Sequence, residues 1–214
     1  MKKRGGASLG LSLSIAILAG GKSSRFGGID KQEALLNGEE LGRIAARNAL
    51  AACGSVIVVG KNRRPYRGMP LGFTEDRLPG FGPLSGLHAA LSAAGTDWVY
   101  LTACDMPFFS PRWLEYLISR VGEGSVQAVV AGSGSYIEPF HGLYSRELEG
   151  RLEAILSEPD SSPRRRSFSR LISEVPHHLV PEALVREFSP DWSLFRSVNS
   201  PADLEALRSG SRTT

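Results

Sequence analysis

Short apolar runs alternate along the chain with stretches in which apolar residues recur at helical spacing. Leu13 to Leu18 is an apolar run with β-branched members that ends at Gly20-Gly21, which predicts a first buried strand. Glu39 to Ala52 carries apolar residues at helical spacing, and Val56 to Val59 predicts the next strand. Strand, helix and strand together predict one βαβ unit.

The same alternation continues through the middle of the chain. Pro83 to Ala94 predicts a helix, and Trp98 to Cys104 is a continuous apolar run, typical of strands that are buried on both faces. Ser110 followed by Pro111 is a good N-cap and first-turn pair, which predicts a helix through Arg120.

Beyond residue 122 the pattern becomes less regular. It predicts strands at 126–131, 139–144 and 195–198, helices at 146–156 and 166–172, and a terminal helix that follows Asn199-Ser200-Pro201 and ends before Gly210. Alternating strands and helices predict an α/β fold, a three-layer α/β/α sandwich with a mostly parallel sheet. We expect residues 13–209 to form a single domain and residues 1–12, which are polar and rich in Gly and Ser, to form a flexible N-terminal extension.

Composition places the chain among folded globular proteins. Hydrophobic residues at 42% and charged residues at 22% exclude a disordered, collagen-like or disulfide-scaffold chain. The formal net charge of +3 is too small for a stripe that binds nucleic acid and fits an anionic small molecule equally well. Cys53 and Cys104 have no spacing for a bridge or a zinc site, which favours a reducing cytoplasm.

The N-terminus imitates a signal peptide, because the charged residues Lys2 to Arg4 precede an apolar stretch from Leu9 to Ala19. Ser12 and Ser14 interrupt that stretch, and no pair of small residues closes it as a cleavage site. No other segment approaches the ~20 apolar residues that span a bilayer. We therefore expect a cytoplasmic protein without a membrane partner.

A glycine-rich loop from Gly20 to Lys31 directly follows the first strand. Its glycines let the backbone present N–H groups to oxyanions, and Arg25 and Lys31 add positive charge, so we interpret it as a phosphate loop. Gly21-Lys22-Ser23 imitates the end of a Walker A motif, but Ala16 stands where that motif requires a glycine. A plain turn is the alternative, although turns seldom combine so many glycines and cations.

Asp105 follows the strongly apolar run that ends at Cys104 and precedes Met106-Pro107. In open α/β sheets ligands bind beyond the carboxyl ends of the strands, so we expect Asp105 at the same edge as the glycine loop. Taken alone, such a carboxylate is more often a helix cap or a member of an ion pair. Beside a triphosphate it is the expected ligand of Mg²⁺, which takes few protein ligands.

Together these motifs resemble the molybdenum cofactor guanylyltransferase family, the MobA-like nucleotidyltransferases, over most of the chain. The matching segments are Leu18-Ala19-Gly20-Gly21 with Ser24-Arg25 and Asp30-Lys31, Gly82-Pro83-Leu84-Ser85-Gly86, Cys104-Asp105-Met106-Pro107 and Ser197-Val198-Asn199-Ser200-Pro201. The resemblance implies a Rossmann-like nucleotidyltransferase fold with the following contacts: GTP on Leu18, Ala19, Gly20, Gly21, Lys31, Asp76 and Asp105, Mg²⁺ on Asp105, and the pterin substrate near Asn199. Ser197 departs from the family pattern, because an Asn is common at that position.

The resemblance implies that the chain transfers GMP from GTP to the molybdenum–molybdopterin cofactor and releases pyrophosphate. The attacking phosphate of the pterin is ionised at pH 7, so alignment and charge stabilisation suffice and no general base is needed. Arg25, Lys31 and Asp105 then form the expected catalytic set. Besides GTP and the molybdopterin cofactor, other proteins of cofactor biosynthesis and molybdoenzymes are candidate partners.

Base choice and turnover leave two alternatives open. One is a cytidylyltransferase of the same fold that acts on molybdopterin or on a sugar or polyol phosphate. The other is a nucleotide-binding regulator without turnover, against which the presence of Arg25, Lys31 and Asp105 argues. The stiff segment Pro79 to Gly86 is suited to reading a base edge with main-chain groups, and Asp76 is close enough in sequence to contribute to guanine selection.

Overall fold

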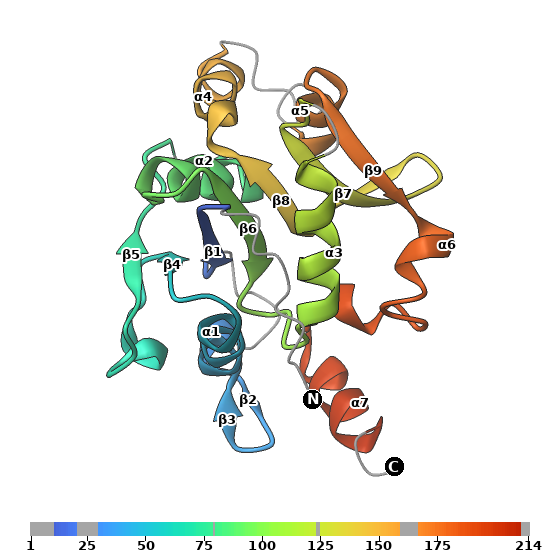
Figure 1. Cartoon of the computed structure of the whole chain (residues 1–214). Helices are drawn as coiled ribbons and strands as arrows, with labels where there is room; N and C mark the ends of the chain where they lie inside the picture. The colour runs from blue at the N-terminus through green and yellow to red at the C-terminus, as the bar shows by residue number, and fades with distance from the viewer. Residues whose placement is uncertain (1–10, 21–29, 79, 123–124, 159–166, 211–214) are drawn as a thin grey trace, which may run out of the picture.

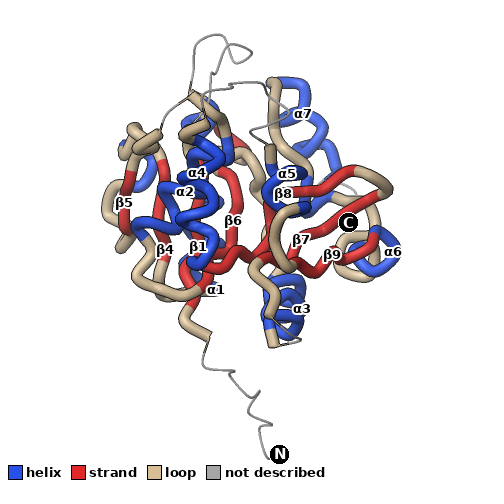
Figure 2. Tube along the Cα trace, turned by 90° about the horizontal axis from the view of Figure 1, so that it is seen from above, coloured by secondary structure: helices blue, strands red, loops and turns tan. Residues whose placement is uncertain are grey.

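A seven-stranded sheet in the order β5-β4-β1-β6-β8-β7-β9 forms the centre of the computed structural model, which describes residues 11–20, 30–78, 80–122, 125–158 and 167–210. The strands are β1 (Leu13–Leu18), β4 (Val56–Val59), β5 (Gly72–Thr74), β6 (Trp98–Ala103), β7 (Ala128–Ser133), β8 (Tyr136–Ser145) and β9 (His177–Pro181). Among these strands β8 alone runs antiparallel to its neighbours, so the prediction of a mostly parallel sheet is confirmed. Figure 2 shows the sheet crossing the molecule from β5 on one side to β9 on the other.

Helices cover both faces of this sheet. They are α1 (Leu41–Ala52), α2 (Pro83–Ala93), α3 (Pro111–Val121), α4 (Glu149–Leu156), α5 (Phe168–Ser173), α6 (Glu182–Val185) and α7 (Pro201–Gly210). Four short 3-10 helices, η2 (Lys31–Glu33), η3 (Arg64–Tyr66), η4 (Arg146–Leu148) and η5 (Ser193–Phe195), and a hairpin of β2 (Leu35–Leu36) and β3 (Glu39–Glu40) complete the described elements.

Alternate residues of β1 face opposite layers of the core. Ile15 and Ile17 pack into a cluster with residues of α1 and α3, whereas Ala16 and Leu18 pack into a second cluster with residues of α2, α4 and α5. Figure 1 shows α2 and α4 on one side of the strands and α1 on the other. The predicted three-layer α/β/α sandwich is therefore confirmed.

The first half of the chain follows the sequence pattern closely. The strands β1 and β4 have the predicted bounds, while α2 and β6 each end one residue earlier than predicted. The helix predicted from Glu39 begins instead at Leu41, because Glu39 and Glu40 pair with β2. Short pairings of this kind depend on tertiary contacts and leave little trace in the hydrophobic pattern.

The second half departs further from the prediction. The observed β7 begins and ends later than the strand predicted at 126–131, and β8 is longer at both ends than the strand predicted at 139–144. The predicted helix at 146–156 consists of η4 followed by α4. The predicted helix at 166–172 is α5, and α7 extends to Gly210 rather than ending before it.

The strand predicted at 195–198 is wrong. Phe195 ends η5, and the segment that follows has no regular secondary structure. The Val198 N–H donates to the carbonyl of Asp105 at 2.8 Å. A single backbone bond of this kind anchors the segment beside β6 but does not make it a strand of the sheet.

The predicted N-terminal extension falls largely outside the described residues, so its boundary and the single domain after it stay predictions. Leu11 packs against the core, and the carbonyl of Ser12 accepts a hydrogen bond from the Trp98 N–H at 3.0 Å. Within the described ranges, no helix combines the length and the apolar character that crossing a membrane requires.

The N-cap of α3 gives a first test of the local structure. The Ser110 hydroxyl accepts a hydrogen bond from the Trp113 N–H at 3.2 Å, as the sequence predicted. We expect Ser110→Ala to lower the free energy of unfolding by about 1 kcal/mol, because this N–H loses its partner. Ser119→Ala on the same helix is the control and should change it by less than ~0.5 kcal/mol. Urea denaturation measures both, and equal losses would contradict the cap.

Candidate active site

Three segments that are distant in sequence meet at the carboxyl ends of the parallel strands. β1 leads into Ala19, β6 leads into Asp105, and the segment before α7 carries Ser197. The Cys104 N–H donates to the carbonyl of Leu18 at 2.9 Å, which aligns the ends of β1 and β6. This is the edge at which an open α/β sheet binds its ligand.

Four polar side chains, Lys31, Asp105, Ser197 and Asn199, form what we call the rim cluster. Lys31 Nζ donates to Asp105 Oδ2 at 3.1 Å and to Asn199 Oδ1 at 2.7 Å. Ser197 Oγ donates to the same Asp105 Oδ2 at 2.9 Å. The structure thus brings together Lys31, Asp105 and Asn199, three of the residues that the sequence assigned to the site.

The rim cluster is only partly open to solvent. The side chains of Lys31 and Asp105 are 24% and 15% exposed. Water therefore screens the attraction between the ammonium and the carboxylate less than it would on an open surface. The pair thus offers a positive group that can attract an anionic ligand and a carboxylate that can hold a cation beside it.

Short-range structure presents Lys31 to the cluster. Asp30 caps η2, and its Oδ1 accepts the Gln32 N–H at 3.3 Å. Lys31 is the first residue of η2 and directly follows the glycine-rich loop. From the end of this loop its side chain reaches Asp105 and Asn199.

The other predicted nucleotide contacts are spread around this edge. Leu18 and Ala19 are buried and Gly20 is exposed, as the end of a core strand requires. Asp76 follows β5 and is exposed as a residue. Neighbouring atoms that displace water raise the pKa of its carboxyl group, and Lys61 lowers this pKa to a smaller extent. None of the described hydrogen bonds joins Asp76 to the rim cluster. Gly21 and Arg25 lie outside the described residues, so their roles stay predictions.

Two polar residues at this edge were not assigned by the sequence. Ser197 was recognised only as a departure from the family pattern, yet it contacts Asp105 directly. Gln32 is buried and donates to the Ala19 carbonyl and to Asp30 Oδ2, and only its place next to Lys31 could have drawn attention to it.

The donor set fits a magnesium ion that takes most of its ligands from water and phosphate. Asp105 Oδ2 accepts from Lys31 and Ser197, whereas Oδ1 has no hydrogen-bond partner in the described part of the chain. The described ranges also hold no group of three or more His, Cys, Asp and Glu residues suited to a metal ion. Mg²⁺ is commonly held by one or two carboxylates together with substrate phosphates, and Asp105 can supply such a ligand.

A buried histidine supports the segment that carries Ser197 and Asn199. The His141 ring lies 5.7 Å from that of Phe195, and its Nδ1 is 2.8 Å from Tyr100 Oη. The Trp113 indole N–H donates to the His141 carbonyl at 2.7 Å. Burial lowers the pKa of His141 to about 3, so the ring is neutral at pH 7.

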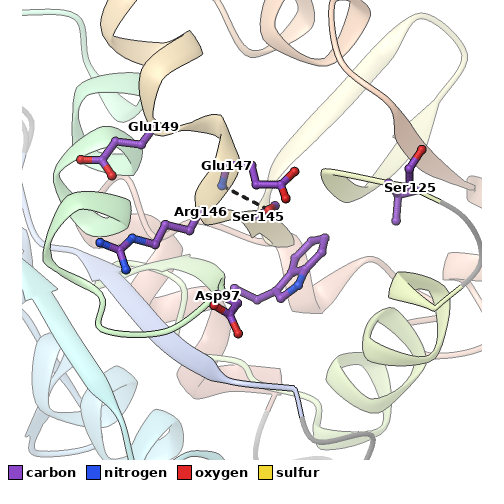
Figure 3. Close-up of a pocket in the computed structure, with 8 residues that line it drawn as sticks. Asp97, Ser125, Ser145, Arg146, Glu147 and Glu149 are labelled. Atoms are coloured by element: carbon purple, nitrogen blue, oxygen red, sulfur yellow. Dashed lines mark hydrogen bonds between the residues drawn. The ribbon is translucent and has the colours of Figure 1, made fainter.

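A separate hollow of about 520 Å³ lies at the opposite end of β6. Its lining includes Asp97, Arg146 and Glu149, and Figure 3 shows Glu149 and Arg146 on one side with Ser125 on the other. The Glu149 carboxylate already accepts from the Ser92 hydroxyl at 2.5 Å. No predicted site residue lines this hollow.

The buried state of His141 predicts a pH dependence of stability. Below the ordinary histidine pKa of 6.5, His141 is protonated in the unfolded chain. In the folded chain its pKa is about 3, so it stays neutral until the pH falls to that value. Stability should therefore fall as the pH drops through this window, by up to about 1.4 kcal/mol per pH unit from this residue.

His141→Asn removes the titrating group and keeps a residue that tolerates the positive φ of 52° at this position. We expect the advantage of the wild type over the variant to shrink from pH 7 to pH 4.5. Urea denaturation at several pH values measures the difference, and other titrating groups cancel because both proteins carry them. Parallel stability curves would contradict the assignment.

Comparison with known proteins adds independent findings. Residues 15–176 match a family model described as the MobA-like NTP transferase domain. A molybdenum cofactor guanylyltransferase from Syntrophotalea carbinolica is 34% identical over 195 residues, which cover 91% of this chain and 90% of that protein. Another with the same name, from Vibrio atlanticus, is 33% identical over 195 residues, which cover 89% and 93% of the two chains.

Solved structures agree on the fold. The crystal structure of molybdopterin-guanine dinucleotide biosynthesis protein A from Archaeoglobus fulgidus matches with a TM-score of 0.77 and 22% identity, covering 94% of this chain and all of that one. A nucleotidyl transferase from Methanothermobacter thermautotroptrophicus matches with a TM-score of 0.70 and 20% identity, covering 95% and 99% of the two chains.

Proposed function

The chain belongs to the family of MobA-like NTP transferases, and we propose that it transfers GMP from GTP to the molybdenum–molybdopterin cofactor and releases pyrophosphate. The observation that carries the proposal is the contact of Lys31 with both Asp105 and Asn199. One cation is thereby placed between the expected metal ligand and the expected pterin contact, where the two substrates must meet.

The hydrogen bonds at the end of β1 indicate which of its residues can contact a phosphate. The Ala19 N–H donates to the carbonyl of Val59 at 2.8 Å, and the Ala19 carbonyl accepts from Gln32. Because both backbone groups of Ala19 are engaged, hydrogen bonds to phosphate should begin at Gly20. Leu18 and Ala19 then contribute van der Waals contacts, and Gly21 and Arg25 continue the phosphate site.

Lys31 neutralises the developing charge on the phosphates in this mechanism. Its ammonium group has three donors, of which Asp105 and Asn199 take two, so one remains for a phosphate oxygen. Asn199 orients the acceptor. The backbone N–H of Asn199 donates to Asp203 Oδ2 at 2.8 Å, which fixes Asn199 at the start of α7. The acceptor phosphate is ionised at pH 7, so no residue has to remove a proton.

Asp105 is the proposed ligand of Mg²⁺. Lys31 and Ser197 hold its Oδ2, which leaves Oδ1 to face the ion. When bound, Mg²⁺ stabilises negative charge on the α-phosphate and on the pyrophosphate leaving group. A cytoplasmic location and contacts with other biosynthetic proteins or molybdoenzymes stay predictions.

The direct test of this function is a transfer assay. The full chain, GTP, Mg²⁺ and molybdenum cofactor should yield pyrophosphate and a guanine dinucleotide that mass spectrometry identifies. Nucleotide binding without transfer would favour a regulator, although the intact rim cluster argues against that reading. Transfer of CMP would instead support a cytidylyltransferase.

Asp105 and Asp97 flank the same strand at opposite ends and offer a matched pair of variants. We expect Asp105→Asn to lower kcat/KM by roughly 10²–10³, because the neutral amide holds the metal poorly. Asp97→Asn, at the exposed far end, should stay within a few-fold of the wild type. Pyrophosphate release at saturating Mg²⁺ measures both rates. An Asp105→Asn rate near that of the wild type would remove this residue from the metal site.

Base choice is the second test. Gly82 has a φ of 62° and precedes Pro83 at the start of α2, and Ser85 Oγ donates to the carbonyl of Leu78 at 2.6 Å. A backbone fixed in this way can form hydrogen bonds with the edge of guanine. When another base is bound, the same backbone groups are left without partners. We expect GTP to be preferred over CTP and ATP by at least ~10² in kcat/KM. Competition between the nucleotides measures this, and indifference would remove residues 80–86 from the base site.

A further inference from the structure

Gln32 is a deeply buried polar side chain at the edge that carries the rim cluster. It is only 1% exposed, although it directly follows Lys31 in the chain. Lys31 reaches outward to Asp105 and Asn199, whereas the Gln32 carboxamide reaches inward to the end of β1. Two neighbouring residues of η2 thus connect it to the reactive edge and to the sheet.

The carboxamide nitrogen of Gln32 joins two parts of the backbone frame. It donates to Asp30 Oδ2 at 2.7 Å and, over a longer distance of 3.4 Å, to the carbonyl of Ala19. Asp30 Oδ2 also accepts from Asn62 Nδ2 at 3.1 Å, which links it to the segment after β4. The cap of η2 is therefore tied to the ends of two parallel strands.

Close packing leaves this link little freedom. A Cβ at Gly60 would lie 2.7 Å from the carbonyl oxygen of Ala19, so the backbone at Gly60 packs closely against that carbonyl. A Cβ at Gly42 would lie 2.7 Å from Tyr66 Oη and 3.1 Å from Gln32 Cβ. Glycine at both positions lets α1 and the segment after β4 approach closely enough to fix Ala19 and Gln32.

The arrangement has a cost that a purely structural residue would avoid. Gln32 Oε1 is buried and has no hydrogen-bond partner among the described residues. Leaving such an acceptor unpaired costs about 1–3 kcal/mol, whereas an apolar side chain of the same length would carry no penalty. Stability alone therefore does not account for a glutamine here, but the contacts of its nitrogen do.

We propose that Gln32 is a positioning residue, which holds η2 so that Lys31 Nζ reaches Asp105 and Asn199 together. This inference rests on the proposed role of Lys31 in nucleotide transfer. Gln32 touches neither substrate and acts through the backbone of η2. Loss of its amide should let η2 shift relative to β1, and small displacements of a catalytic group have large effects on rate.

Gln32→Met tests the proposal, because methionine keeps the length of the side chain and removes both polar atoms. We expect kcat to fall roughly 10- to 100-fold, while the thermal midpoint stays equal to that of the wild type or rises. Gln127→Met is the matched control. Its amide contacts Glu147 at 3.0 Å at the far end of the sheet, so kcat should not change.

The Lys31→Ala background decides whether Gln32 acts through Lys31. If it does, Gln32→Met should cause no further fall in kcat once Lys31 is absent. A loss of equal size in both backgrounds, an unchanged kcat in the single variant, or a lowered thermal midpoint would each overturn the proposal. Failure of this proposal can be told apart from failure of the proposed function. The wild-type reaction first shows which nucleotide the chain transfers, and all variants are then compared on that nucleotide.

Discussion

The ammonium group of Lys31 connects parts of the chain that lie 74 and 168 positions away, at Asp105 and Asn199. These contacts require β1 and β6 to lie side by side in a register that pairs Leu18 with Ala103. A partly buried cation needs compensating partners, and the sheet supplies them only when all three segments are in place. The site is therefore a product of the complete fold rather than of any single motif.

The central strands were predictable because burial on both faces demands continuous apolar runs, as in β1, β4 and β6. The short edge strands β5 and β9 were missed, since β5 has no fully buried residue and β9 has only one, so both resemble loops. The strand expected at 195–198 failed for a related reason. Its apolar residues pack against the core without joining the sheet.

Some residues of the candidate site could likewise be predicted from the sequence, and others could not. Lys31 and Asp105 could be predicted from their positions at the end of the glycine-rich loop and after β6, because topology brings such positions to one edge. Asn199 came only from the family resemblance. The contact of Ser197 with Asp105 spans 92 positions and depends on how the last segment packs, and Gln32 shows no functional pattern in sequence. Side-chain contacts of this kind follow from tertiary packing, which local pattern does not specify.

Some buried polar groups of the described chain are paired and others are not. Near the amino ends of the central strands, buried Ser14 is paired with Ser55 at 2.7 Å and with Thr96 at 2.8 Å. Near the carboxyl ends, Gln32 Oε1 and Tyr66 Oη are buried without a partner among the described residues. Each unpaired group lowers stability, so selection for stability alone would favour an apolar replacement at these positions. Departures from local consistency are expected where function constrains the choice of residue. Gln32 directly follows Lys31 in the chain, so its unpaired oxygen is such a departure beside the proposed site.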